Sequence, residues 1–353
     1  MASVTDHRPE HRPAADPTHP HRERTQQPRG QNVRGAAIPL VVGLFIGTIF
    51  ATVFLAAFHD PKPHHLPVAV VAPAQVITAL QTQSRSNDDA IDFRSYSTAS
   101  AARSALSDRT VFGAFIVDVQ GPTLLVAGAN GPSVTQTLQG VFTAAAQATR
   151  SPLTVVDVQP LSVGDSRGLS VFYGAFGVVL AGFLFGLTSM QLAATLPPRW
   201  RAASALVFSA AAGLVVAWLL QPVFGALPAP LFTTAVVVGL LALAVGATTT
   251  ALLKVFGPAG TFLAAVALLV VGNATSTGIL PGQYLPGWLE PMTAVLPVGV
   301  AVRALRGAAY FHDDGVASAI LVLAAWAVGA ALLFAAGDLV QRRRQRPLEV
   351  TGA

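Results

Sequence analysis

Four polar residues lie close together near the end of a long apolar stretch of the chain. They are Asn273, Thr275, Ser276 and Thr277. Inside a membrane, amide and hydroxyl groups can hydrogen-bond across packed helices or line a wet cavity. The four residues are therefore a candidate lining of a transport pathway, and contacts between packed helices are the alternative interpretation.

The next segment, Pro281–Asp314, has the most distinctive composition of the chain. It contains four prolines that interrupt helices, three aromatic residues and an acidic residue. They are Pro281, Pro286, Pro291 and Pro297, then Tyr284, Trp288 and Tyr310, and Glu290. We expect its aromatic residues at a membrane interface. Val298–Leu305 is apolar but too short to span, and Arg303 and Arg306 lie at its end. This pattern predicts an outer re-entrant or interfacial segment whose arginines snorkel to the surface. The alternative is that the arginines attract anionic head groups or an acidic substrate.

A third candidate is a short basic and aromatic stretch between two apolar runs. It reads Pro198, Arg199, Trp200 and Arg201, within the polar turn Gln191–Ala202. Such a stretch suits an interfacial anchor.

Several kinds of chemistry are excluded by what the chain lacks. It has no cysteine, so thiolate catalysis and cysteine metal sites are excluded. A P-loop requires a Gly-Lys pair, but the only lysines, Lys62 and Lys254, follow Pro61 and Leu253. We find no zinc-protease motif and no nucleophile elbow, and adjacent His64 and His65 are typical of a loop. We therefore expect no enzyme activity, no cofactor and no metal.

The candidate residues described above lie within or between six apolar stretches of the chain that contain no charged residue. They are Ala36–Phe58, Leu169–Met190, Ala203–Leu220, Leu231–Leu253, Ala259–Leu280 and Gly315–Ala336. Each is near the roughly 20 residues that cross a hydrocarbon core as a helix. The chain is 52% hydrophobic and 11% charged, and its charges cluster between the stretches, which argues against a large soluble protein. The absence of ionisable residues inside the stretches argues against a proton relay.

Basic residues indicate the topology. Arginines crowd residues 1–35 and the tail 338–353, and basic residues also follow the second and fourth stretches. The positive-inside rule then places both termini in the cytoplasm. This asymmetry explains the pI of 10.2 without nucleic acid as a partner. Residues 1–35, rich in Pro, His, Arg and Gln, are predicted to be a disordered tail, and the first stretch an uncleaved anchor.

The polar insert at residues 59–168 has the pattern of a small α/β domain. Strands are predicted at Val68–Ala72, Ile91–Tyr96, Val111–Val117, Thr123–Ala127 and Leu153–Val158. Helices are predicted at Ala74–Thr82, after a Ser97 or Thr98 cap, and from Pro132. The expected fold is a polytopic α-helical membrane protein with six transmembrane helices. The small extracytoplasmic α/β domain lies between the first and second helices, and a five-helix unit spans residues 169–337.

The layout resembles the permease subunits of ABC-2-type transporters, and within them the phage-infection-protein-like (Pip/YhgE-like) branch. Three stretches carry the likeness: Tyr96-Ser97-Thr98-Ala99 with Gly113–Val117, Val158–Leu161 with Phe172-Tyr173-Gly174, and Gly272–Gly278 with Tyr284–Pro286 and Ala301–Arg306. The resemblance implies a homo- or heterodimeric membrane unit that exports a hydrophobic or amphiphilic molecule or lipid. It also implies that Gln191–Ala202 contacts a separate nucleotide-binding ATPase subunit.

Two functions are expected on this basis. The first is a permease-like subunit in the plasma (inner) membrane of a bacterium, whose genome the bias of Arg over Lys marks as GC-rich. The alternative is a stand-alone membrane scaffold or secretion-accessory protein whose outer domain binds a partner. A P-loop ATPase encoded beside this chain would favour the first.

Overall fold

The computed structural model describes residues 29–86, 90–148 and 151–345. Its contacts divide the chain into two units, Met1–Ile46 and Gly47–Ala353. The described part of the first unit is the beginning of helix α1 (Arg29–Phe58). Because α1 begins at Arg29, the end of the tail predicted to be disordered is helical. The rest of that predicted tail lies outside the described residues.

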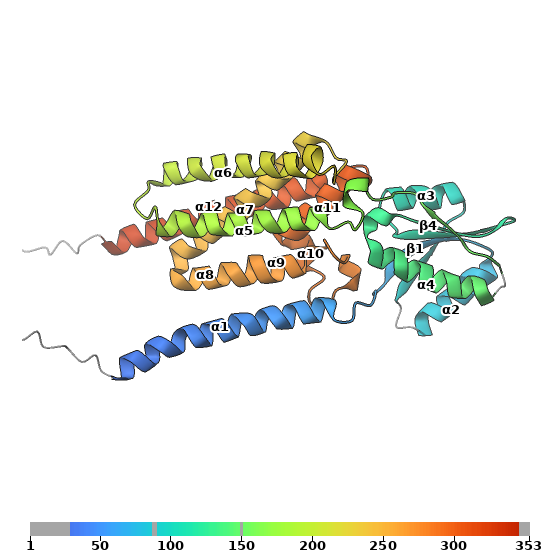
Figure 1. The fold of residues 1–353 in the computed structure, drawn as a ribbon, viewed down its shortest axis with the longest axis horizontal. Helices are drawn as coiled ribbons and strands as arrows, with labels where there is room; N and C mark the ends of the chain where they lie inside the picture. Colours follow the sequence, from blue (N-terminus) through green and yellow to red (C-terminus); the bar gives the residue numbers. More distant parts are fainter. Residues whose placement is uncertain (1–28, 87–89, 149–150, 346–353) are drawn as a thin grey trace, which may run out of the picture. The chain divides into compact units, whose positions relative to one another are not determined.

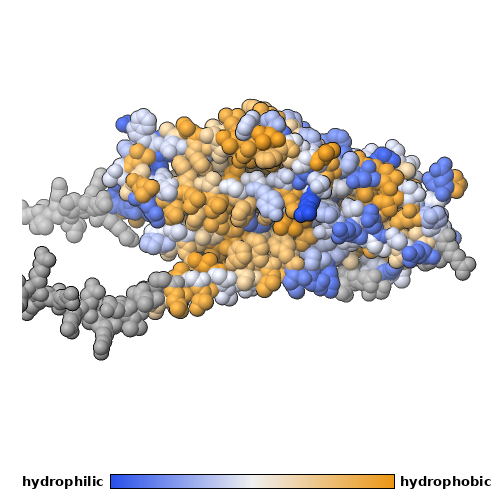
Figure 2. Space-filling model, in the orientation of Figure 1, coloured by the Kyte–Doolittle hydropathy of each residue, from blue (hydrophilic) through white to orange (hydrophobic). Residues whose placement is uncertain are grey.

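Among the described residues, five helices are long and apolar enough to cross a membrane. They are Leu40–Phe58 in α1, α5 (Ser170–Gln191), α6 (Pro198–Trp218) with its π-helical extension η3 (Leu219–Val223), α7 (Leu231–Phe256) and α12 (Val316–Gln345). The protein is therefore a helical membrane protein. Figure 2 shows an apolar surface over the helices of the second unit, between more polar surfaces.

The predicted span Ala259–Leu280 differs from the other five. It is a shorter helix, Pro258–Ala274, built from α8 (Pro258–Ala264), the π-helix η4 (Ala265–Val271) and α9 (Gly272–Ala274). The helix ends early because Thr275 leaves helical geometry and Thr277 has a left-handed φ of 57°. Ser276 and Thr277 consequently belong to a loop.

Helix α7 is the centre of the helix bundle and contacts α5, α6, α8, α11 and α12. Small residues permit the closest approaches. A side chain at Gly213 of α6 would collide with the Ala235 carbonyl of α7, and one at Gly186 of α5 would collide with Thr249. Close backbone approach at small residues is the usual basis of helix packing in membranes.

The chain between α1 and α5 forms a mixed sheet in the order β2-β1-β3-β4-β5, as far as it is described. The strands are β1 (Leu66–Val71), β2 (Ile91–Ser95), β3 (Gly113–Asp118), β4 (Gly121–Val126) and β5 (Thr154–Asp157). Strand β3 pairs antiparallel with β4, and the other neighbours are parallel. Gly121 and Pro122, read from the sequence as a turn, begin β4, and the hairpin loop is Val119–Gln120.

Three helices cover the sheet: α2 (Ala74–Ser86), α3 (Ala99–Ser107) and α4 (Pro132–Ala148). Alternation along β1 sends Val68 and Val70 to one face, where α2 and α4 pack, and Ala69 to the other, where α3 packs. Thr98 caps α3 by accepting a hydrogen bond from the Ala101 N–H at 3.1 Å. The short 3₁₀-helices η1 (Gly128–Asn130) and η2 (Val163–Asp165) lead out of β4 and toward α5.

The segment between α9 and α12 folds back on itself beside the bundle (Figure 1). It contains η5 (Gly282–Tyr284), α10 (Met292–Val295) and α11 (Pro297–Tyr310). The indole N–H of Trp326 in α12 donates to the Val295 carbonyl at 2.9 Å. Trp326 lies ten residues beyond the start of α12. The end of α10 therefore lies beside α12 at a point about 15 Å from the first residue of that helix. Helix α11 then returns toward the sheet, with most of its residues from Pro297 to Gly307 buried.

We call the end of the bundle nearer the sheet the domain end. The opposite end, where α5 ends and α6 begins, we call the tail end (Figure 1).

Candidate functional site

Arg306 of α11 is the most deeply buried charged residue among those described, at 3% exposure. Its guanidinium donates to the carbonyl oxygens of Thr277 at 3.0 Å, Gly278 at 2.8 Å and Gly168 at 2.9 Å. It therefore joins the loop after α9 and the entry to α5. Arg306 does not snorkel to a surface, as the sequence pattern suggested, because these carbonyl oxygens hold it inside the protein.

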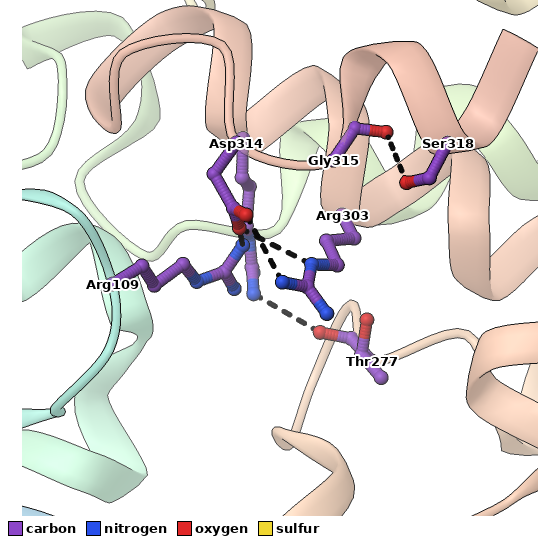
Figure 3. A network of polar contacts seen from close by, with 7 residues as sticks. Arg109, Thr277, Arg303, Asp314, Gly315 and Ser318 are labelled. Carbon is purple, nitrogen blue, oxygen red and sulfur yellow. Dashed lines mark hydrogen bonds and ion pairs between the residues drawn. The ribbon is translucent and has the colours of Figure 1, made fainter.

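Asp314, in the turn between α11 and α12, faces two further arginines (Figure 3). Arg303 binds it with two hydrogen bonds of 3.1 and 3.0 Å. Arg109, from the turn after α3, approaches it at 3.7 Å and lies over the Phe311 ring at 5.0 Å. Burial and the nearby charge of Arg306 lower the pKa of Arg109, and Asp314 opposes that shift. Asp314 thus links the α/β domain to the helix bundle.

Two tyrosines make further links between the domain and the bundle. The Tyr310 hydroxyl accepts a hydrogen bond from the Ser162 N–H at 3.1 Å. The Tyr284 hydroxyl bonds the Thr137 hydroxyl on α4 at 2.9 Å, and burial raises the pKa of Tyr284. Tyr284 is only 3% exposed, so it does not occupy the membrane interface that its residue type suggested. Trp288 is exposed at 58%, and Glu290 is exposed as well.

Apolar residues complete the junction. Leu280 and Tyr284 belong to the core on the α2 and α4 face of the sheet. Phe311 belongs to the core on the α3 face. The loops at the domain end of the bundle thus supply side chains to both faces of the sheet, and the domain is packed directly against the bundle.

The predicted pathway residues mostly bond the backbone of their own segment. Asn273 donates to the Leu269 carbonyl at 2.8 Å, and Thr275 to the Val271 carbonyl at 2.8 Å. Ser276 accepts from the Gly278 N–H at 3.4 Å. All three side chains are buried, and the side-chain amide oxygen of Asn273 (Oδ1) has no hydrogen-bond partner among the described residues. Within the described residues, these contacts correspond to helix and loop packing.

In the basic turn between α5 and α6, one buried arginine holds the backbone in place, and two other side chains are exposed to the surroundings. Arg201 is 7% exposed and donates to the Ser189 carbonyl, to the Ser189 hydroxyl at 2.7 Å and to the Ala193 carbonyl at 2.7 Å. Pro198 begins α6 at a position where proline is favoured. Arg199 and Trp200 are exposed. The turn is consequently held from within and offers a basic and aromatic surface.

No group of three or more metal-ligating side chains occurs among the described residues. His64 is tied by its backbone N–H to the Gln283 carbonyl at 2.7 Å, and the neighbouring His65 has a left-handed φ of 50°.

The residues that sequence reasoning did not single out are Arg109, Asp165 and Asp314. Asp165 accepts the N–H groups of Leu169 at 3.0 Å and Ser170 at 3.1 Å, and so caps the start of α5. Asp165 lies five residues before Ser170, outside the usual N-cap position, so the common cap signal does not identify it. Arg109 and Asp314 lie far apart in sequence, and no local pattern connects them.

The fold and these contacts define a helical membrane protein with a mixed α/β domain fixed to one end of its helix bundle. Comparison with protein-family models, with curated proteins and with solved structures gives no match.

Proposed function

We propose that this protein is the membrane subunit of an exporter that moves a hydrophobic or amphiphilic molecule, with ATP hydrolysed by a separate subunit. The α/β domain is then extracytoplasmic, both termini are cytoplasmic, and the protein lies in a bacterial plasma membrane. The sequence layout and its resemblance to ABC-2-type permeases favour this function, and so does the lack of charged residues in the predicted spans.

The observation that carries the proposal is the turn between α5 and α6. A permease that is driven by an ATPase needs a firm contact element on the cytoplasmic side. Arg201 fixes this turn from within, while Arg199 and Trp200 remain exposed. Arginine and tryptophan are the residue types that most often dominate binding at protein interfaces.

The folded-back segment from Pro281 to Tyr310 supports the same function. In the proposed topology it enters the membrane from outside, turns at α10 and returns through α11. Non-helical backbone at membrane depth is tolerated where it is buried in protein or lines a cavity. A segment of this kind is suited to close one side of a transport route.

Affinity purification of the full-length protein from its native host tests the proposal. We expect a P-loop ATPase to co-purify and Arg199→Glu or Trp200→Ala to reduce its recovery about tenfold, a change of about 1.4 kcal/mol. Arg167→Glu reverses an exposed charge before α5 and is the matched control. The proposal fails if the unaltered protein recovers no ATPase and vesicles containing it with every co-purifying chain show no transport.

One observation favours the alternative, a scaffold whose domain binds a partner. Strand β5 is exposed along its whole length and pairs with β4, and exposed strand edges accept further strands. If this alternative holds, replacing Val155 by Pro abolishes recovery of a partner protein, and Arg199→Glu has no effect.

A further inference from the structure

The last strand of the sheet, β5, is open on one side along its whole length. It pairs with β4, no strand lies beyond it in the described sheet, and its residues are all exposed. The Val158 N–H donates to the Val126 carbonyl at 2.9 Å, so this N–H faces β4. Because backbone groups alternate in direction along a strand, the N–H and C=O groups of Val155 and Asp157 face the open side. A further extended chain satisfies such a row of donors and acceptors.

The two edges of the sheet differ in the charges that protect them. Charged residues on an edge strand discourage pairing with another chain. The opposite edge, β2, carries Asp92 and Arg94, which pair at 2.9 Å. Residues 151–156 carry no charge. The carboxylate of Asp157 accepts the Gly128 N–H at 3.0 Å, so it holds the end of its own strand. The edge at β5 is therefore the unprotected one.

Both faces of β5 offer apolar surface to a strand beside it. Val155 pairs with Leu124, which belongs to the core on the α2 and α4 face of the sheet. Val156 pairs with Leu125, which belongs to the core on the α3 face. The two valines are 39% and 38% exposed. A strand that pairs with β5 would extend both cores, and this requires apolar side chains on both of its faces.

The direction of β5 decides whether a second copy of the chain can supply that strand. Beyond β5, the Ser162 hydroxyl donates to the Gly225 carbonyl of the bundle, so β5 runs toward the bundle. Strand β4 is parallel to β5 and begins at the end of the domain away from the bundle (Figure 1). The strands therefore run roughly along the helix axes.

Two copies in one membrane are related by rotation about the membrane normal, so their β5 strands would be parallel. Parallel pairing requires an offset of one residue between the two strands, and a two-fold axis produces none. Antiparallel self-pairing would place the second bundle on the wrong side of the domain. Pairing with β2 of a second copy would set Asp92 and Arg94 against Val155 and Val156, which leaves charges beside apolar surface. A different protein is therefore the better partner for this edge.

We propose that β5 binds an extended segment of a second protein, antiparallel to β5, that carries a run of consecutive uncharged β-branched or aromatic residues. The backbone groups of Val155 and Asp157 bond this segment, and its side chains extend both cores. Antiparallel pairing is the more stable arrangement, and β-branched and aromatic residues pair well across strands. The proposal rests on the edge that favours the scaffold function, names the chemistry of the partner, and does not require transport.

The test uses the full-length protein in nanodiscs and hydrogen exchange resolved by residue. The probe is the synthetic peptide Thr-Val-Ile-Val-Thr, followed by lysines for solubility. At a peptide concentration about ten times its Kd, the Val155 and Asp157 amides should exchange about tenfold more slowly. The Val156 and Val158 amides already face β4 and should not change. A peptide with Asp in place of Ile is the control and should have no effect.

Three substitutions at one position sharpen the test. Val155→Pro removes an outward N–H and leaves the bonds to β4 in place, so it should weaken peptide binding at least tenfold. Val155→Lys adds a protecting charge without changing the backbone and should weaken binding similarly. Val155→Thr keeps both the N–H and the β-branched shape, and should bind as the unaltered protein does. The proposal is overturned if the peptide leaves the Val155 and Asp157 amides unchanged, or if the lysine variant binds normally.

A photoreactive benzoylphenylalanine in place of Val155 extends the test to the native host. We expect it to cross-link an uncharged apolar segment of another protein, as mapped by mass spectrometry. The same group in place of Asp92, on the protected edge, is the control. Cross-linking to a second copy of this chain, or to a charged segment, would overturn the proposal.

The outcomes also separate this inference from the proposed function. Absence of strand binding with normal ATPase recovery and transport rejects the partner strand and leaves the exporter intact. Slower exchange at Val155 and Asp157 without ATPase or transport supports the partner strand and rejects the exporter.

Discussion

The guanidinium of Arg306 donates a hydrogen bond of 2.9 Å to the carbonyl oxygen of Gly168, a residue 138 positions earlier in the chain. The same side chain binds the Thr277 and Gly278 carbonyls. The Arg306 guanidinium therefore holds three segments together where the α/β domain joins the bundle: α11, the loop after α9 and the entry to α5.

Replacing Arg306 by Lys should destabilise the protein. A lysine ammonium keeps the charge but lacks the planar fork that reaches carbonyl oxygens in two directions. Each lost hydrogen bond to a charged group is worth about 1.5–3 kcal/mol. We expect a lower melting temperature in nanodiscs. Arg303→Lys, at a side chain that is 58% exposed, should have a smaller effect, and equal effects would contradict this role of Arg306.

Asp314→Asn should weaken the link between Arg109 and the bundle. Arg109 is deeply buried, and the substitution removes the carboxylate that approaches it. Breaking a buried ion pair by removing one partner costs about 3–5 kcal/mol. Thermal unfolding of the purified protein measures the loss. Asp92→Asn breaks an exposed pair with Arg94 and should change stability by less than about 1 kcal/mol.

The junction should lose stability at alkaline pH. Burial raises the pKa of Tyr284 above its ordinary value of 10.0. The folded protein then keeps this proton at a pH where the unfolded chain loses it, so stability is full below pH 10 and falls as the pH rises above it. Melting temperatures measured between pH 8 and pH 11 should show the fall. Burial also raises the pKa of Tyr310 at the same junction, so Tyr284→Phe should reduce the fall without abolishing it, and an unchanged slope would exclude Tyr284 as one of its sources.

Gly213→Ala should disturb the packing of α6 on α7. The added methyl group would collide with the Ala235 carbonyl, and overpacking costs about 1–3 kcal/mol. Gly177 in α5 is a matched control, because a methyl group there would meet nothing within 4 Å. Gly177→Ala should be neutral or slightly stabilising, since alanine favours helix. Thermal inactivation rates in detergent compare the two variants.

Arg201→Ala should differ from Arg199→Ala in its effect on structure. Arg201 holds the turn before α6 through its hydrogen bonds to Ser189 and Ala193, whereas Arg199 is exposed. We expect faster proteolysis within Gln191–Ala202 for Arg201→Ala and unchanged proteolysis for Arg199→Ala. Faster cleavage in both would mean that the exposed arginine also holds the turn.

Local patterns predicted much of the fold. The alternation that places Val68 and Val70 on one face of β1 is visible in the sequence, and the Thr98 cap of α3 follows a known signal. The structure agrees at both places because the interactions that decide them lie within a few residues. The five long apolar helices were predictable for the same reason, since apolar length alone decides their insertion.

Contacts between distant residues were less predictable. Arg306 was interpreted as a snorkelling residue because its neighbours in sequence form a short apolar helix. Its actual partners lie in the loop after α9 and before α5, and only the tertiary fold brings them together. Tyr284 was expected at a membrane interface for a similar reason, but it completes one face of the sheet. Aromatic residues suit both environments, so residue type does not decide between them.

Phe311 and Tyr284 complete the two faces of a sheet whose last strand ends at Asp157. After the last strand has been translated, roughly 150 more residues must be synthesised before Phe311 is added to the chain. This takes on the order of ten seconds. During that interval the apolar faces of the sheet are incomplete and must be kept from aggregating. Nascent chains that stop before Phe311 are consequently expected to be substrates of chaperones and proteases.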